Sequence, residues 1–121
     1  MQHEEIGAWI PFLKRIALFK DLSSEVLDRI AGLLKPLSLP RGATLFQQGD
    51  SADAFYIITS GQIRIFTEGQ GSQKMTAYLS RGDTLGELSL LTGELRSMSA
   101  VLDTTSEFLV LSKKDFAEVT S

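Results

Sequence analysis

The amino-acid sequence predicts a mainly β fold with flanking α-helices: an antiparallel β-roll of the double-stranded β-helix or jelly-roll type. Two observations lead to this prediction. Apolar residues at helical spacing are confined to the two ends of the chain. Between them, short apolar runs alternate with turns about every 8–12 residues, which is typical of a sandwich or barrel. Six glycines mark these turns, at positions 42, 49, 61, 71, 82 and 93.

The length and composition predict one domain with its own hydrophobic core. The chain has 121 residues, of which 43% are hydrophobic and 22% are charged. These proportions are those of a globular protein rather than a disordered one. We therefore expect a single domain over residues 1–121, with N-terminal helices in about 6–35, the β-roll in about 37–111 and a short C-terminal helix in about 113–119.

Helical spacing in the N-terminal region predicts two helices. The first apolar run falls within residues 6–16, where Pro11 either occupies a first helical turn or splits the run. Ser23 is a good N-cap for the second helix. Pro36 and Pro40 are expected to stop the helical structure. The apolar stripe of the second helix comprises Val26, Leu27, Ile30, Leu33 and Leu34.

We expect roughly eight short strands between Leu37 and Leu111. Ser60-Gly61 is a two-residue turn signal, and residues 69–72 read as a longer hairpin loop. Ser112 is expected to cap the last helix. Alternation or β-branched and aromatic composition identifies strands within 55–59, 62–67, 75–79, 99–102 and 108–111.

One short pattern occurs twice, as Arg41-Gly42-Ala43-Thr44-Leu45 and forty residues later as Arg81-Gly82-Asp83-Thr84-Leu85. A roll built from two similar halves would produce this repetition. Two unrelated Arg-Gly turns would produce it as well.

The composition excludes several classes of function. Fifteen acidic against twelve basic residues give a net charge of −3, which argues against a nucleic-acid-binding face. The absence of cysteine excludes disulfides, thiolate metal sites and a cysteine nucleophile, and a single histidine, His3, excludes a site that needs two imidazoles. We expect no metal site, no enzymatic activity and no membrane segment. A cytoplasmic location follows from the acidic start of the chain, which does not resemble a signal peptide.

Residues 85–97 combine the groups that a phosphate and a sugar need. Gly86 allows the backbone to turn and to approach a ligand closely, and Glu87 supplies an acceptor at the start of a helical turn. Arg96 supplies a guanidinium next to the hydroxyl of Ser97. From the residues alone, Glu87 could equally complement a helix dipole, and Arg96 could lie on a solvated face.

This stretch resembles the phosphate-binding cassette of cyclic nucleotide-binding domains, as found in the catabolite-activator family and in cyclic-nucleotide-dependent kinases. The family pattern F-G-E-L-A-L followed by P-R-A-A-T-V corresponds to residues 85–90 and 95–100. Phe46–Asp50 is similar to the family's F-x-x-G-D motif. Residues 56–63 and 111–116 are similar to its Y-x-I-x-x-G-x-V and L-x-x-x-D-F motifs. The resemblance covers about Phe12 to Phe116.

The resemblance implies a role for each residue of the cassette. Arg96 would pair with the exocyclic oxygens of a cyclic phosphate, from a position outside the core. Glu87 would accept from the ribose 2′-hydroxyl. The backbone N–H groups of Gly86, Leu88 and Ser97 would complete the phosphate site. The side chains of Ile65, Leu79 and Met98 are candidates for lining the base. For Ile65 and Leu79 the alternative is a plain role in the hydrophobic core.

Two departures from the family pattern concern the pocket. Leu95 stands in place of the usual proline, and Met98 is bulkier than the small residue that the family has beside the phosphate. Ser97 occupies the position where some cAMP binders have alanine, many cGMP binders have threonine, and the catabolite activator has serine. The implied ligand is therefore cAMP or cGMP, and no other cofactor is implied.

The resemblance implies a regulatory module that binds a cyclic nucleotide and relays its occupancy to a protein partner or an attached effector domain. The alternative is a degenerate domain that serves as a protein-interaction scaffold without ligand. In the family, a long helix after the barrel covers the base and often dimerises, so a homodimer is compatible with the resemblance. Only five residues follow Phe116 here and no helix-turn-helix is present, so we expect no DNA binding by this chain alone.

Overall fold

The computed structural model describes residues 9–87, 89–92 and 94–120. Two helices, α2 (Ile10–Leu13) and α3 (Ser24–Leu33), precede the strands, and α5 (Lys113–Thr120) follows them. The short helix α4 (Ser89–Thr92) lies between two strands. Among the described residues there are eight strands: β1 (Lys35–Leu39), β2 (Thr44–Phe46), β3 (Ala54–Ser60), β4 (Gln62–Gly69), β5 (Ser72–Ser80), β6 (Thr84–Leu85), β7 (Ser99–Leu102) and β8 (Ser106–Ser112).

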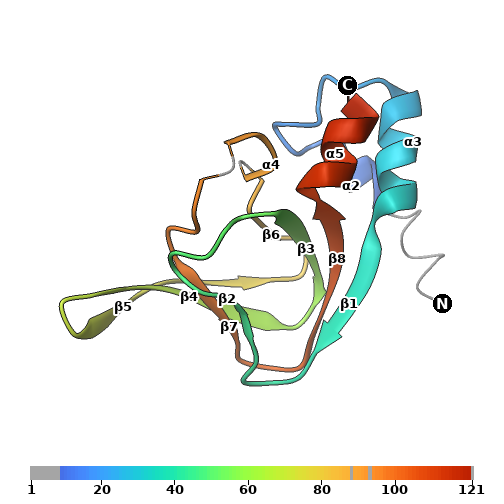
Figure 1. The fold of residues 1–121 in the computed structure, drawn as a ribbon. Coiled ribbons are helices and arrows are strands. Elements are labelled where there is room, and N and C mark those ends of the chain that lie inside the picture. The colour runs from blue at the N-terminus through green and yellow to red at the C-terminus, as the bar shows by residue number, and fades with distance from the viewer. Residues whose placement is uncertain (1–8, 88, 93, 121) are drawn as a thin grey trace.

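The strands form two four-stranded sheets, in the orders β1-β8-β3-β6 and β2-β7-β4-β5. The strand pairings that the structure describes are antiparallel, which confirms the predicted β-roll. The helices α2, α3 and α5 gather at one end of the roll, and the β4–β5 hairpin extends away from it (Figure 1). None of the helices in the described ranges has the length and apolar character that crossing a bilayer requires.

The apolar sequence of β3 is explained by burial on both of its faces. Phe55 and Ile57 pack with the helices in one hydrophobic cluster, whereas Ile58 packs inside the roll in a second cluster. Successive side chains of a strand point to opposite faces, so a strand that is covered on both sides loses polar alternation. The inner cluster consists of Ile58, Ile63, Ile65, Leu85, Ala100, Leu102 and Phe108.

The predicted helix caps are confirmed. The Oγ atom of Ser23 accepts a hydrogen bond from the backbone N–H of Val26 at 3.2 Å, and that of Ser112 accepts from Asp115 at 3.0 Å. Pro11 occupies the first turn of α2, the first of its two predicted alternatives. Within the described part of this run, only Ile10–Leu13 is helical, and turns follow where more helix was expected.

Two connections differ from their sequence signals. The turn at Ser60-Gly61 is not a hairpin, because β3 and β4 belong to different sheets and Gly61 carries the chain from one sheet to the other. The hairpin between β4 and β5 is tighter than expected, with Gln70 (φ 52°) and Gly71 (φ 79°) between the paired ends Gly69 and Ser72. Positive φ at both central residues suits the right-handed twist of an antiparallel pair.

The repeated Arg-Gly pattern corresponds to a repeated structure. Gly42 donates its N–H to the carbonyl of Leu102 at 2.8 Å, and Leu102 donates back to Ala43 at 3.0 Å. In the second copy, Gly82 donates to Ile58 at 2.9 Å, and Ile58 donates back to Asp83 at 3.0 Å. The first copy leads into β2 in one sheet, and the second leads into β6 in the other. The roll therefore contains two similar turn-and-strand units.

Gly61→Ala is expected to destabilise the protein by about 2–4 kcal/mol, because its φ of +105° disfavours an L side chain and a Cβ would come within 2.8 Å of the Cα of Ser106. Gly71→Ala is the matched control, since its φ is also positive but no atom lies within 4 Å of the added Cβ. We expect about 1 kcal/mol for this variant. Urea unfolding of both variants measures the difference, and equal losses would show that the contact with Ser106 is unimportant.

Candidate functional site

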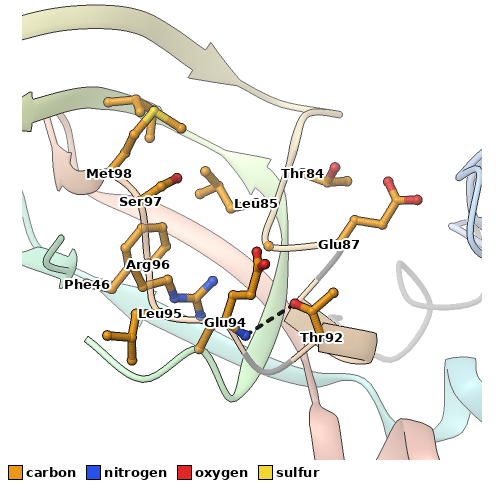
Figure 2. Close-up of a pocket in the computed structure, with 13 residues that line it drawn as sticks. Phe46, Thr84, Leu85, Glu87, Thr92, Glu94, Leu95, Arg96, Ser97 and Met98 are labelled. Carbon is orange, nitrogen blue, oxygen red and sulfur yellow. Dashed lines mark hydrogen bonds between the residues drawn. The ribbon is translucent and has the colours of Figure 1, made fainter. Parts of the chain in front are cut away.

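A pocket of about 410 Å³ lies where β2 and β6 end (Figure 2). Its size is within the range of roughly 300–1,000 Å³ that is usual for small-molecule sites. Six of the predicted site residues line it, and one of them, Ile65, is also a buried member of the inner cluster. Leu79 packs against that cluster and does not line the pocket, and Leu88 lies outside the described residues. The lining residues are Phe46, Ala52, Ile65, Thr84, Leu85, Gly86, Glu87, Thr92, Glu94, Leu95, Arg96, Ser97 and Met98.

The cassette begins where β6 ends. Gly86 has a φ of +84°, a conformation that glycine adopts without the steric cost that other residues incur. The single helical turn α4 follows, but it begins at Ser89, so Glu87 precedes it instead of starting it as expected. After α4 the N–H of Glu94 donates to the Oγ1 atom of Thr92 at 3.2 Å, which helps to fix the backbone just before Arg96 (Figure 2).

The backbone of Arg96 is held by the turn that follows β2. The N–H of Arg96 donates to the carbonyl of Asp50 at 2.8 Å, and the N–H of Gly49 donates to the carbonyl of Arg96 at 2.8 Å. The turn itself is closed by hydrogen bonds between Gln47 and Asp50, one of them from the N–H of Gln47 to the Asp50 carboxylate at 2.9 Å. The Phe46–Asp50 motif therefore supports the cassette directly.

Arg96 is buried, with 7% of its surface exposed, so it does not lie on the solvated face that the residues alone allowed. It belongs to neither hydrophobic cluster, in agreement with a position outside the apolar core. Its Nη2 atom donates to the carbonyl of Ala54 in β3 at 2.9 Å. Its guanidinium carbon lies 4.2 Å from the ring centroid of Phe46 and 5.7 Å from that of Tyr56. Its Nε atom has no hydrogen-bond partner within the part of the chain that the structure describes.

Burial also determines the electrostatics around Arg96. It lowers the pKa of the guanidinium, and this shift is opposed by Tyr56, Asp53 and Asp50, in that order. Burial likewise raises the pKa of the Tyr56 phenol, with a smaller opposing effect of the Arg96 charge. Both groups keep their usual ionisation states near neutral pH, so Arg96 is a cation and Tyr56 is neutral.

Glu87 contacts the N-terminal region instead of Arg96. Its Oε2 atom accepts a hydrogen bond from the backbone N–H of Leu18 at 2.9 Å, and its carboxylate points away from the guanidinium (Figure 2). A carboxylate has four lone-pair directions, so this bond leaves acceptor capacity on the side chain. Glu87 thus connects the cassette with the turns that follow α2.

The rest of the pocket has an apolar wall and an acidic side. Ile65, Leu85 and Met98 provide apolar surface, with Met98 half-buried, and Ser97 is exposed at the rim. The sequence analysis assigned no role to Glu94, whose carboxylate extends into the pocket (Figure 2). Phe46 and Tyr56 are likewise not among the expected site residues, although each is the first residue of a motif that resembles the family pattern.

This chain is similar to known regulators over most of its length. A family described as cyclic nucleotide-binding domain matches residues 36–121. A cyclic AMP receptor protein from Thermus thermophilus is 36% identical over 105 residues, which are 86% of this chain and 49% of that protein. A cAMP-dependent protein kinase regulatory subunit from Mucor circinelloides f. lusitanicus is 34% identical over 108 residues, 89% of this chain and 25% of that protein. The chain spans at most about half the length of these two relatives.

Solved structures have the same fold. A cyclic nucleotide-binding-like protein from Brucella abortus superposes with a TM-score of 0.84 at 32% identity, covering 92% of this chain and 96% of that one. The regulatory domain of Toxoplasma gondii PKA, crystallised with cAMP, has a TM-score of 0.80 at 21% identity and covers 98% of this chain and 46% of that one, a likeness of fold alone. The family match, the relatives above 30% identity and the antiparallel roll agree, and the chain belongs to the cyclic nucleotide-binding domain family.

Proposed function

We propose that this chain binds a cyclic nucleotide, cAMP or cGMP, and relays the occupancy of its pocket to a protein partner or an attached effector domain. The observation that carries the proposal is the buried side chain of Arg96, whose Nε atom has no partner among the described residues and which lines the pocket. Buried polar atoms are nearly always paired. An exocyclic oxygen of a cyclic phosphate would supply a charged acceptor for this atom.

The remaining contacts follow from the positions of the lining residues. The positive φ of Gly86 lets the backbone approach the phosphate closely, with Ser97 and Leu88 completing the phosphate site as the family motif implies. Glu87 would accept from the ribose 2′-hydroxyl through the capacity that Leu18 does not use. Ile65 and Met98 would contact the base. No step in this proposal is catalytic, because the ligand leaves the pocket unchanged.

The hydrogen bond between Glu87 and Leu18 offers a starting point for the relay. A ribose hydroxyl that draws the Glu87 carboxylate toward the pocket would weaken its bond with the N-terminal region. The ligand would then bind the two arrangements of this region with different affinities, which is the requirement for any ligand-driven shift. A cytoplasmic location is part of the same proposal.

Calorimetric titration of the chain with cAMP, and then with cGMP in the same buffer, tests the binding. Saturable binding of one nucleotide per chain is expected for at least one of the two ligands. The absence of binding to both would favour the alternative, a scaffold domain without ligand.

Arg96→Ala is expected to weaken cyclic nucleotide binding by about 2–5 kcal/mol, at least thirtyfold, because the phosphate would lose its charged partner. Arg96→Lys keeps the charge but not the two-pronged donor geometry, so an intermediate loss is expected. Arg64→Ala is the control, because Arg64 does not line the pocket and forms a surface ion pair with Asp103 at 3.1 Å. If calorimetry gives Arg96→Ala a dissociation constant within threefold of the wild-type value, Arg96 does not bind the phosphate.

The same two alanine variants should differ in stability. Arg96→Ala removes the bond to Ala54 and the contacts with two rings, so we expect a loss of about 1–3 kcal/mol. Arg64→Ala removes a surface pair and should cost at most about 1 kcal/mol. Urea unfolding without ligand separates the two, and an unchanged midpoint for Arg96→Ala would contradict a structural contribution of its side chain.

Glu87→Gln tests the ribose contact. The amide is a weaker acceptor than the carboxylate, so we expect cAMP affinity to fall by about 1–2 kcal/mol, less than for Arg96→Ala. The loss should nearly vanish with 2′-deoxy-cAMP, since that ligand lacks the hydroxyl. Equal losses for the two ligands in parallel titrations would place Glu87 in a supporting role, through its bond with Leu18.

A further inference from the structure

We propose that Phe46 and Tyr56 are positioning residues for Arg96. Their rings hold the guanidinium in one orientation before a ligand arrives, with its Nε atom left for the phosphate. This inference rests on the proposed function, because the two rings would raise the affinity for a cyclic phosphate only by orienting Arg96.

The geometry places the guanidinium against both rings. Its carbon is 4.2 Å from the centroid of Phe46 and 5.7 Å from that of Tyr56, within the distance of about 6 Å at which a cation is attracted by an aromatic face. The two rings are themselves 6.1 Å apart, with planes inclined by 34°. Figure 2 shows Phe46 beside Arg96 at the wall of the pocket.

Each ring is held in place by its own surroundings. Phe46 ends β2 and directly precedes the turn that is hydrogen-bonded to the Arg96 backbone. Tyr56 lies within β3, two residues after Ala54, the carbonyl of which accepts from Nη2. The Tyr56 ring also contacts Phe108 edge to face, at a centroid distance of 6.0 Å. Backbone and side chain of Arg96 are therefore fixed by the same two segments.

The rings matter because the guanidinium makes few other contacts. Within the described residues, the guanidinium donates a hydrogen bond to the carbonyl of Ala54, and Nε has no partner. A desolvated cation is stabilised by an aromatic face, and the more so the less water is present. A side chain that is already oriented loses less conformational freedom when its ligand binds. The rings would thus contribute to affinity without touching the phosphate.

Phe46→Leu is the main test, with Phe46→Tyr as the conservative variant that keeps a ring. Phe66→Leu is the matched control, because it removes a ring that also lies next to an arginine. The guanidinium carbon of Arg64 is 5.9 Å from the Phe66 ring centroid, and neither residue lines the pocket. Calorimetry with cAMP and cGMP measures the affinity. For Phe46→Leu we expect a loss of about three- to thirtyfold, with most of the affinity retained by Phe46→Tyr and no loss for Phe66→Leu.

A second measurement requires no ligand. Nuclear magnetic resonance of the arginine Nε–H groups should show the Arg96 signal displaced by the ring currents of Phe46 and Tyr56 in the wild type. The signal should move toward ordinary arginine values in Phe46→Leu and stay displaced in Phe46→Tyr. A double-mutant cycle with Arg96→Lys completes the test, because a ring that acts through Arg96 should matter less once the guanidinium is gone.

The outcomes are separable. An Arg96 signal without ring-current displacement in the wild type overturns the inference, whatever the nucleotides do. A displaced signal that moves in Phe46→Leu, together with unchanged nucleotide affinity, also overturns it. Equal losses from Phe46→Leu in the wild-type and Arg96→Lys backgrounds assign Phe46 a merely structural role. A wild-type chain that binds neither nucleotide refutes the proposed function and, with it, the contribution to affinity, while the resonance data still decide whether the rings orient Arg96.

Discussion

Burial of the positive charge on Arg96 is the constraint around which this end of the roll is arranged. A cation removed from water is costly unless nearby groups replace its hydration. Here the replacement comes from the carbonyl of Ala54 and from the faces of Phe46 and Tyr56. The negative charges of Asp53 and Asp50 act in the same direction. These groups come from β2, β3 and the segment between them, so the positions of those strands and of the guanidinium depend on one another.

The strand β3, which carries Ala54 and Tyr56, is packed on both of its faces. β3 carries Tyr56 toward the inside of the roll and Phe55 and Ile57 toward the helices, so its position is fixed by packing on both faces. The cassette itself contains little regular structure, with one short helix and two exposed leucines, Leu91 and Leu95. Leu90 of α4 is nevertheless buried in the cluster that holds the helices. Hydrogen bonds add further links to the scaffold, from Arg96 to the neighbouring turn and from Leu18 to Glu87.

Local chemistry explains what the sequence revealed of this fold. The caps at Ser23 and Ser112 depend on residues within a few positions of each other, so their residue types were sufficient evidence. The resemblance to the family identified six of the lining residues of the pocket. The burial of Arg96 could not be inferred in this way, because it results from Phe46 and Ala54, which precede it by more than forty positions. The crossing between sheets at Gly61 was missed for the same reason, since strand pairing is decided by partners far along the chain.

The two similar turn-and-strand units belong to different sheets, and each sheet supplies one side of the pocket. β2 brings Phe46 from one sheet, and β6 brings Leu85 and leads into Gly86 from the other. Arg96 lies across this junction, because its guanidinium faces Phe46 of one sheet and is bonded to Ala54 of the other. A molecule that binds both the guanidinium and the backbone at Gly86 would consequently join the two halves of the roll. Its binding energy would oppose separation of the two sheets. Occupancy would therefore raise the free energy of unfolding of the whole roll, as well as order one loop.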